Sequence, residues 1–252
     1  MNSQSSENPT DSLLLPDMRE VWQQTLNWQP DAVQQGQLQC LYELIVTGNR
    51  QLNLTRITTP IEFWEKHLWD SLRGVAPLLE SVQSPQAVID IGTGGGFPGL
   101  PVAIARSDWR ITLLDSTRKK IAFIESLFSQ LEIENATTLT ARVEEIGQLE
   151  QHRQHYDIAL IRAVASASVC AEYALPLLKE GGVAILYRGE WAEEETTGLK
   201  GASKKLGGAI ASIEEFTTPV SNSRRTCIYL KKVAPTPAEF PRAVGVPNQK
   251  PL

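Results

Sequence analysis

The sequence predicts an α/β fold with a mostly parallel, seven-stranded sheet, helices on both faces of the sheet and a helical extension at the N-terminus. From Gln86 onward, short apolar runs alternate with segments of helical periodicity, and this alternation is typical of parallel strands joined by crossover helices. A glycine-rich turn follows the first apolar run, and Gly181-Gly182 precedes the fifth. Hydrophobic residues make up 42% of the 252 residues, enough for a sizeable core, which excludes collagen, a coiled coil and wholesale disorder.

The residues ahead of the sheet divide into two parts. Residues 1–16 are polar and carry Ser, Asn and Pro, and we expect them to be disordered. Residues 17–84 are expected to form an N-terminal helical region. Asp31 is a candidate N-cap, and three apolar residues recur after it at helical spacing: Leu38, Leu41 and Ile45.

A further helix start is predicted at residue 60. The segment Thr59-Pro60-Ile61-Glu62 has the form of a capping box with proline at the first helical position. The helix should run to about Ser71 and present three apolar side chains on one face: Ile61, Trp64 and Leu68.

Seven strands are predicted within residues 85–232. The candidates are Ala87–Ile91, Arg110–Leu114, Ala136–Leu139, Ile158–Ile161, Val183–Tyr187, Ala209–Phe216 and Thr226–Leu230. Helices are expected after the first strand through Ile104, over Arg118–Gln130, after the fourth strand through Leu178, and near Trp191–Leu206. The Gly181-Gly182 pair should break the third of these helices.

The charge is unevenly distributed along the chain. The net charge is −5, but residues 219–252 carry six basic side chains and one acid, a net +5 against −10 for residues 1–218. A basic end on an acidic body suits local contact with a polyanion, and a solvated tail is the open alternative. The last residues, 233–252, contain five prolines and no periodicity, so we expect an extended basic arm.

Membrane and disulfide signals are weak in this sequence. No run approaches the roughly 18 apolar residues of a membrane span, and the N-terminus has no basic and apolar pattern of a signal peptide. Three cysteines, Cys40, Cys170 and Cys227, lie far apart and are expected to be buried, reduced and not metal-bound. We therefore expect a cytoplasmic protein that contacts no membrane. We also expect a monomer.

The glycine-rich turn runs from Gly92 to Gly99 and predicts a nucleotide-type ligand. Glycines allow a sharp turn and a close approach of the ligand to the backbone. Asp115 ends the next strand 23 residues after Gly92, the distance at which a carboxylate accepts hydrogen bonds from a ribose diol. The spacing Gly94-x-Gly96-x-x-Gly99 also matches a dinucleotide fingerprint, so an NAD(P)-dependent oxidoreductase is an open alternative.

Three features favour S-adenosylmethionine over a dinucleotide. Asp90 lies two residues before the first glycine, where a carboxylate can hold the amino-acid end of the ligand directly or through water. Pro98 removes an amide donor that a pyrophosphate would use. The passage LLKEGGV at 177–183 is common before the fifth strand of methyltransferase sheets. The expected fold is therefore that of a class I S-adenosylmethionine (SAM)-dependent, Rossmann-like methyltransferase, with residues 85–232 as the SAM-binding domain.

Six further stretches carry a resemblance to a known family. They are LNLT at 52–55, His67-x-x-Asp70-Ser71-Leu72, IDIGTGGGFPGLP at 89–101, LLDSTRKK at 113–120, ARVEE at 141–145 and IRA at 161–163. With them the chain resembles the RsmG (GidB) family of bacterial methyltransferases, which methylate N7 of a guanine in 16S (small-subunit) rRNA. The end of the chain, from Phe240-Pro241-Arg242 to Lys250-Pro251-Leu252, resembles the longer-tailed members.

The resemblance implies a set of cofactor residues, and the basic residues near the strand ends are candidates for RNA contact. Those expected at the cofactor are Asp90, Gly92, Gly94, Phe97, Asp115, Ser116, Thr117, Val143, Glu144 and Arg162, with Glu144 and a backbone amide at Val143 reading the adenine edge. Four basic residues are expected toward RNA, because a phosphate backbone needs cations: Lys119, Arg142, Arg162 and Arg225. For each of them a solvated position at the surface is the open alternative. The family often has Glu-Arg at Arg224-Arg225, and the downstream spacing favours Arg225.

The resemblance also implies the reaction and its catalytic residues, Arg162, His67 and Asp70. Guanine N7 has an in-plane lone pair and no proton, so direct in-line attack on the methyl group needs no general base. A positioning role for His67, which can share a helix face with Asp70, is therefore favoured over a general-base role. The sequence shows no metal-ligand cluster. The alternatives are the oxidoreductase above and a non-catalytic rRNA-binding assembly factor, and the substrate is naked rRNA, a small subunit or its assembly intermediate.

Overall fold

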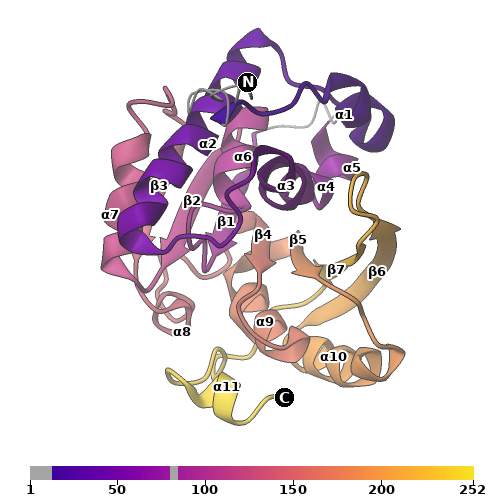
Figure 1. Ribbon diagram of the computed structural model, residues 1–252. Helices are drawn as coiled ribbons and strands as arrows, with labels where there is room; N and C mark the ends of the chain where they lie inside the picture. The colour runs from indigo at the N-terminus through magenta and orange to yellow at the C-terminus, as the bar shows by residue number, and fades with distance from the viewer. Residues whose placement is uncertain (1–12, 80–84) are drawn as a thin grey trace, which may run out of the picture.

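The computed structural model describes residues 13–79 and 85–252. In these ranges a seven-stranded sheet has the order β3-β2-β1-β4-β5-β7-β6 (Figure 1). Strands β1 to β5 run parallel, whereas β7 is antiparallel to β5 and β6. The strands are β1 (Ala87–Ile91), β2 (Arg110–Asp115), β3 (Ala136–Thr140), β4 (Tyr156–Arg162), β5 (Leu178–Arg188), β6 (Gly208–Thr217) and β7 (Arg224–Lys232). The predicted mostly parallel sheet is confirmed, and its order reverses between β1 and β4, where such sheets bind ligands.

Helices cover both faces of the sheet, and each face has its own hydrophobic core. On one face α6 (Gly99–Ala105) and α7 (Arg118–Leu127) pack on β2, and α2 (Ala32–Leu52) packs over both helices. On the other face α9 (Ala167–Ala174) packs on β4 and β5, and α10 (Glu193–Lys205) packs on β6. The short helix α8 (Val143–Ile146) follows β3. No helix in the described part of the chain is long and apolar enough to cross a membrane.

The N-terminal region forms the predicted helices α1 (Arg19–Leu26) and α2. The Asp31 side chain accepts from Gln34 N, and the Gln34 side chain accepts from Asp31 N, so this N-cap is confirmed. Of the residues predicted to be disordered, 1–12 lie outside the described part of the chain. For residues 13–15 the prediction is wrong, because the Gln39 amide donates to Leu13 O and accepts from Leu15 N.

The helix predicted from residue 60 forms as α3 (Pro60–Phe63), a π-helical turn η2 (Trp64–Trp69) and α4 (Asp70–Arg73), followed by α5 (Ala76–Leu79). Two details of the prediction are wrong. The Thr59 hydroxyl donates to the Glu62 carboxylate instead of capping the backbone. Ile61 is exposed while Trp64 and Leu68 are buried; Ile61 lies in the first turn of the four-residue helix α3, ahead of the π-helical turn that contains the other two.

The Gly181-Gly182 pair lies inside β5 and does not break the preceding helix. The helix α9 ends at Ala174, and a 3-10 turn η3 (Leu175–Leu177), which contains Pro176, leads into the strand. The glycines sit where the register of β5 against β4 shifts, and Gly181 has φ of 84°, as at a β-bulge. The prediction was wrong because proline ends this helix first.

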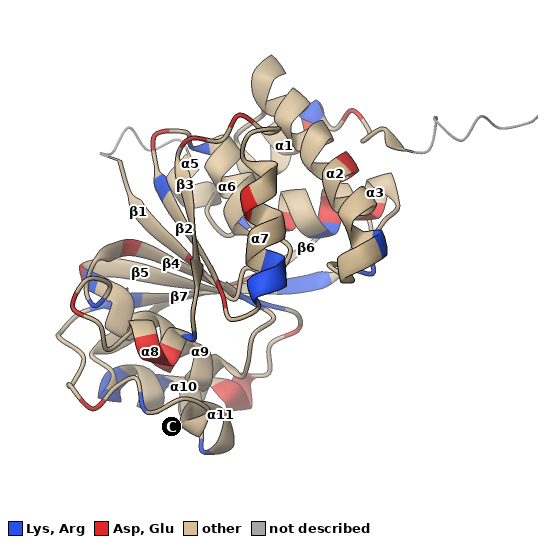
Figure 2. Ribbon diagram, turned by 90° about the vertical axis from the view of Figure 1, so that its left-hand side faces the viewer, with Lys and Arg blue, Asp and Glu red and all other residues tan. Residues whose placement is uncertain are grey.

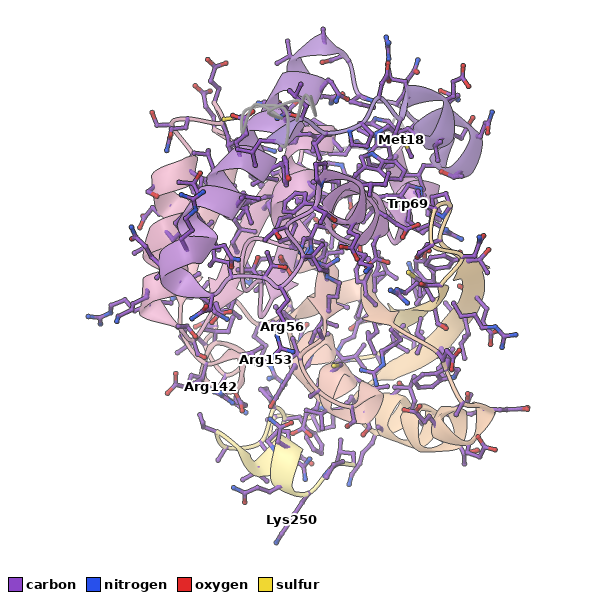
Figure 3. The ribbon with its side chains drawn as sticks, in the orientation of Figure 1. Met18, Arg56, Trp69, Arg142, Arg153 and Lys250 are labelled. Atoms are coloured by element: carbon purple, nitrogen blue, oxygen red, sulfur yellow. The ribbon has the colours of Figure 1, made fainter. Side chains whose placement is uncertain are left out.

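Residues 233–252 are not the extended arm that the sequence predicts. They fold back beside α9 and end in α11 (Val246–Gln249) (Figure 1). Phe240 is buried in the core of that face, and Arg153, labelled in Figure 3, donates to Thr236 O and Phe240 O. The Arg242 guanidinium pairs with the buried Glu172 carboxylate at 2.6 Å. These partners are 70 to 87 residues away along the chain, so no local pattern indicates them.

Candidate active site

The glycine turn lies at the carboxyl end of β1 and is hydrogen-bonded to β2. The amides of Gly92 and Thr93 both donate to Leu114 O, at 2.8 and 2.9 Å. Gly92 has φ of 71°, and a Cβ atom there would lie 2.7 Å from the Val164 side chain. Only glycine fits this position without strain, so the turn brings bare backbone to the edge of the sheet.

Asp90 is fully buried beneath this turn. Its Oδ2 accepts from the Thr93 hydroxyl at 2.6 Å and from Gly99 N at 2.8 Å. Its Oδ1 is buried and has no hydrogen-bond partner within the described residues, and burial raises the pKa of Asp90 to about 6. An unsatisfied buried acceptor costs about 1–3 kcal/mol, so the site fits a ligand that brings a cationic donor.

Asp115 links the turn to the next strand end. Its carboxylate accepts from Gly94 N at 3.0 Å and from Thr117 N at 2.8 Å. Beside it lies a cavity of about 170 Å³ lined by Ile91, Gly92, Leu114, Asp115, Ser116, Ala141, Arg142, Val143, Val164, Tyr173 and Asn248. The structure thus gathers the predicted residues Gly92, Asp115, Ser116 and Val143 around one cavity. Tyr173 and Asn248 were missed, because they come from α9 and from the C-terminal segment.

A second group of predicted residues meets at the end of β4. The Arg162 guanidinium donates to Lys66 O and to the Asp70 carboxylate, both at 3.0 Å. It lies 3.5 Å from His67 Nδ1 and 5.8 Å from the centre of the Phe97 ring.

Arg162, Asp70, His67 and Phe97 therefore form one cluster, which η2 and α4 position against the glycine turn. His67 stacks on Phe97 with 4.5 Å between ring centres. Its Nε2 lies 2.7 Å from the Thr55 hydroxyl. Thr55 belongs to the LNLT stretch and was missed as a site residue. Ala163, directly after Arg162, has φ of 55°, and backbone strain of this kind gathers at functional sites.

The burial of His67 has a consequence for stability. Burial, together with the charges of Arg162 and Lys66, lowers the pKa of His67 to about 3. Between pH 6.5 and 3 the unfolded chain therefore binds a proton at this residue that the folded protein does not, so acidification destabilises the fold. On going from pH 7 to pH 5 this linkage amounts to about 2 kcal/mol. We expect His67→Gln to lose about that much less stability than the wild type over the same range, measured by urea unfolding.

Two controls accompany this measurement. The raised pKa of Asp90 acts in the opposite direction below pH 6, but both proteins contain Asp90, so the difference between them isolates His67. His155→Gln replaces an exposed histidine and controls for the loss of a histidine as such. Parallel pH curves for the wild type and His67→Gln would contradict the low pKa of His67.

Arg142 and Glu144 follow β3 and were predicted to contact RNA and adenine, but they form an ion pair with each other. Arg142, labelled in Figure 3, pairs with the buried Glu144 at 2.6 Å. The same carboxylate accepts from the Tyr173 hydroxyl and from Gly245 N. The polar atoms of Glu144 thus face protein partners, and Arg142 is already neutralised.

The other residues predicted to contact RNA, Lys119 and Arg225, lie at the carboxyl edge of the parallel strands. Lys119 is exposed in the first turn of α7, which also carries Arg118 and Lys120 and is blue in Figure 2. Arg225 is half-buried at the start of β7, and its guanidinium donates to Arg224 O. An exposed arginine that was missed, Arg56, projects from the loop after α2 (Figure 3).

The fold and the site together define a class I SAM-dependent methyltransferase. The strand order, the glycine turn and the carboxylate of Asp115 fit a nucleoside. The Oδ1 of Asp90, which has no partner in the described part of the chain, fits the ammonium group of the cofactor's amino-acid end. Residues 34–227 match the model of the family "rRNA small subunit methyltransferase G". The chain belongs to this family, so the oxidoreductase alternative is wrong.

Curated relatives agree over nearly the whole chain. The "Ribosomal RNA small subunit methyltransferase G" of Nostoc sp. is 66% identical over 242 residues, which cover 95% of this chain and 99% of the relative. The protein of the same name from Trichodesmium erythraeum is 61% identical and covers 97% of each chain.

Solved structures support the fold alone. A 16S rRNA (adenine(1408)-N(1))-methyltransferase mutant from Catenulisporales acidiphilia has a TM-score of 0.52 at 15% identity, with 60% of this chain and 87% of that chain covered. A branched-chain polyamine synthase mutein from Thermus thermophilus, in complex with 5'-methylthioadenosine, has a TM-score of 0.54 at 13% identity over 67% and 56% of the two chains. Because the second neighbour is named for a different reaction, the site and not the fold decides the chemistry.

Proposed function

We propose that the protein methylates N7 of a guanine in 16S rRNA, with S-adenosylmethionine as the methyl donor. Bound in the pocket of the glycine turn, this cofactor supplies an electrophilic methyl group on a sulfonium ion. The observation that carries the proposal is the Arg162 cluster, which lies against the glycine turn in a member of an rRNA methyltransferase family. N7 carries a lone pair and no proton, so the site has to align the two reactants and accommodate the charge that moves to the base.

Each residue of the site has a role that suits this chemistry. Asp90 and Asp115 would hold the two ends of the cofactor's aminoacyl-ribose part, with Gly92 and Gly94 leaving room for it. The low pKa of His67 keeps its ring neutral near pH 7, so it can stack on Phe97 and position it. Arg162, held by Asp70 and Lys66 O, is the group we place beside both cofactor and base.

The exposed basic residues at the carboxyl edge are proposed to contact the phosphates of the RNA. Lys119 is a good test, because it is exposed and takes part in none of the ion pairs among the described residues. Lys119→Glu should weaken binding to 16S rRNA and reduce the slope of log affinity against log salt by about one, the value for one lost phosphate contact.

A matched control is available on β2, the strand that precedes α7. Arg110→Glu makes the same charge change at an exposed residue at the start of β2, the opposite end of the strand that leads to α7. It should bind RNA like the wild type. Equal losses in both variants, read by filter binding at several salt concentrations, would mean that net charge alone decides and that Lys119 makes no contact.

The experiment that tests the function is a map of 7-methylguanosine in 16S rRNA from cells with and without this gene. Restoring the wild-type gene should restore one modified guanine. A folded Arg162→Ala variant should bind rRNA and leave the guanine unmodified. Unchanged methylation after deletion would instead favour the non-catalytic assembly factor.

Separate incubations with naked rRNA, an assembly intermediate and the complete subunit would identify the preferred substrate. We propose that the enzyme acts as a monomer in the cytoplasm, where such substrates are found.

A further inference from the structure

The C-terminal segment 240–252 is built into the wall of the cofactor cavity. It lies beyond residue 227, the last residue that the family model matches. Asn248 of α11 lines the same cavity as Gly92, Asp115 and Val143, although it is distant from all three in the sequence. A cofactor in this cavity would therefore meet the end of the chain.

The segment is fixed in place by two buried carboxylates. Glu172, which is fully buried, accepts from Arg242 N at 2.9 Å and from both Nε and Nη2 of its guanidinium. Glu144, which is 2% exposed, accepts from Gly245 N at 3.1 Å. Buried carboxylates that are satisfied in this way hold their partners strongly, because breaking either pair would leave a buried charge unpaired. The segment is thus a fixed part of the protein on this face.

A chain of hydrogen bonds orients Asn248 at the cavity. Its Nδ2 donates to the Tyr173 hydroxyl at 3.1 Å, and that hydroxyl donates to the Glu144 carboxylate at 3.2 Å. The bond from Nδ2 to Tyr173 orients the carboxamide, and its oxygen, which is an acceptor, can take a hydrogen bond from a donor on a ligand. The Asn248 side chain is exposed, so a ligand could reach it.

The position of Asn248 indicates which part of the cofactor it would meet. Asp90 and the Arg162 cluster lie at β1 and β4, and Asp115 at the end of β2, so the base of the nucleoside would extend toward the end of β3, where Ala141 and Val143 line the cavity. Adenine presents an exocyclic amine, which is a donor.

We infer that the C-terminal segment is a part of the cofactor site, and that Asn248 accepts a hydrogen bond from the adenine amine and so favours adenine over other bases. This inference rests on the proposed use of S-adenosylmethionine. It assigns to Asn248 the reading of the adenine edge that the sequence predicted for Glu144, and Glu144 becomes the anchor of the segment that carries Asn248.

Titration calorimetry with two ligands tests the contact. S-adenosylhomocysteine carries the amine, and S-inosylhomocysteine has a carbonyl in its place. Asn248→Ala should weaken binding of the first about five- to tenfold, as for one lost hydrogen bond, and binding of the second much less. Gln249→Ala removes a neighbouring exposed amide that does not line the cavity and should leave both affinities unchanged. Equal losses on both ligands, or no loss, would overturn the inference.

Proteolysis of the wild-type protein gives a second, independent readout. Trypsin cleavage after Arg242 releases residues 243–252, and S-adenosylhomocysteine should slow this cut, whereas the cut after the exposed Arg19 on α1 should be unaffected. An unprotected Arg242 bond in a protein that binds the ligand would contradict the inference alone. A wild-type protein that binds neither ligand would instead contradict the proposed function.

Discussion

Arg162→Ala is expected to lower the single-turnover rate of methyl transfer by about a hundredfold or more. The Arg162 side chain is only 15% exposed, and its guanidinium connects η2, α4 and the glycine turn through Lys66 O, Asp70 and Phe97. Loss of a buried charged contact that acts in the transition state typically amounts to a few kcal/mol, and 1.36 kcal/mol is tenfold in rate. The measurement is transfer from labelled S-adenosylmethionine to 16S rRNA in a single turnover.

Two comparison variants distinguish the effect of losing Arg162 itself from the effect of losing its ion pair and from a general loss of stability. Asp70→Asn keeps Arg162 but removes the charge of its partner, and should lose much less rate. Arg188→Ala removes an arginine that ends the neighbouring strand β5 and donates to Ala165 O, and should stay within a few-fold of the wild type. Thermal melting with and without S-adenosylhomocysteine checks that each variant folds. Near-wild-type turnover in a folded Arg162→Ala protein would exclude this arginine from the active site.

Local patterns predicted the parts of the fold that depend on neighbours in the sequence. The alternation of apolar runs located the strands, because central strands such as β1 and β4 are buried and are built mostly of hydrophobic residues. Asp31, the first residue of the capping box with Gln34, could be predicted as an N-cap, because capping involves residues only three positions apart. The turn from Gly92 was recognisable because glycine is needed where φ is positive and Val164 lies close.

The parts that were not predicted depend on partners far along the chain. The prolines near the end of the chain suggested an extended arm. Arg242 is instead held against the protein by the buried carboxylate of Glu172 in α9, and nothing in the sequence of that helix indicates that this carboxylate is buried. Arg142 and Glu144 were assigned to RNA and adenine separately, although they are two residues apart and pair with each other. The side chains predicted from the glycine-turn and fourth-strand motifs lie around the turn and the end of β4, whereas their orientation is set by contacts that a motif does not contain.

The π-helical turn η2, at the centre of the site, also makes contacts that local sequence patterns do not predict. A regular helix predicted that His67 and Asp70 share a face, and both do contact Arg162. The widened turn also buries Glu65, which accepts from Val220 N and Ser221 N in the loop between β6 and β7. This helix is therefore held from both sides, by Arg162 of β4 and by the loop, and π-helical turns of this kind are frequent at functional sites.

Asp90→Asn is expected to weaken binding of S-adenosylhomocysteine about a hundredfold, which corresponds to the loss of a charge-assisted hydrogen bond of about 2–3 kcal/mol. Asparagine has the shape of aspartate, so it can fill the same space under the turn. What it lacks is the negative charge at the buried Oδ1, which has no partner in the described part of the protein and which the ammonium group of the ligand would neutralise. Asp157→Asn, at a carboxylate near the opposite end of β4 that binds Ala87 N and Lys179, is the matched control.

The pH dependence of binding distinguishes charge from shape at this position. Because burial raises the pKa of Asp90 to about 6, the wild-type carboxylate is ionised at pH 7 and takes up a proton as the pH falls below 6. A ligand that needs the ionised form should then bind about tenfold more weakly for each further pH unit, while Asp90→Asn, which cannot ionise, should show a flat profile. Titration calorimetry from pH 7.5 to pH 4.5 measures the affinity of both proteins for the ligand. If the two proteins bind equally at pH 7, or if their pH profiles run parallel, the Asp90 carboxylate does not hold the cationic end of the ligand and the ammonium must be bound elsewhere in the turn.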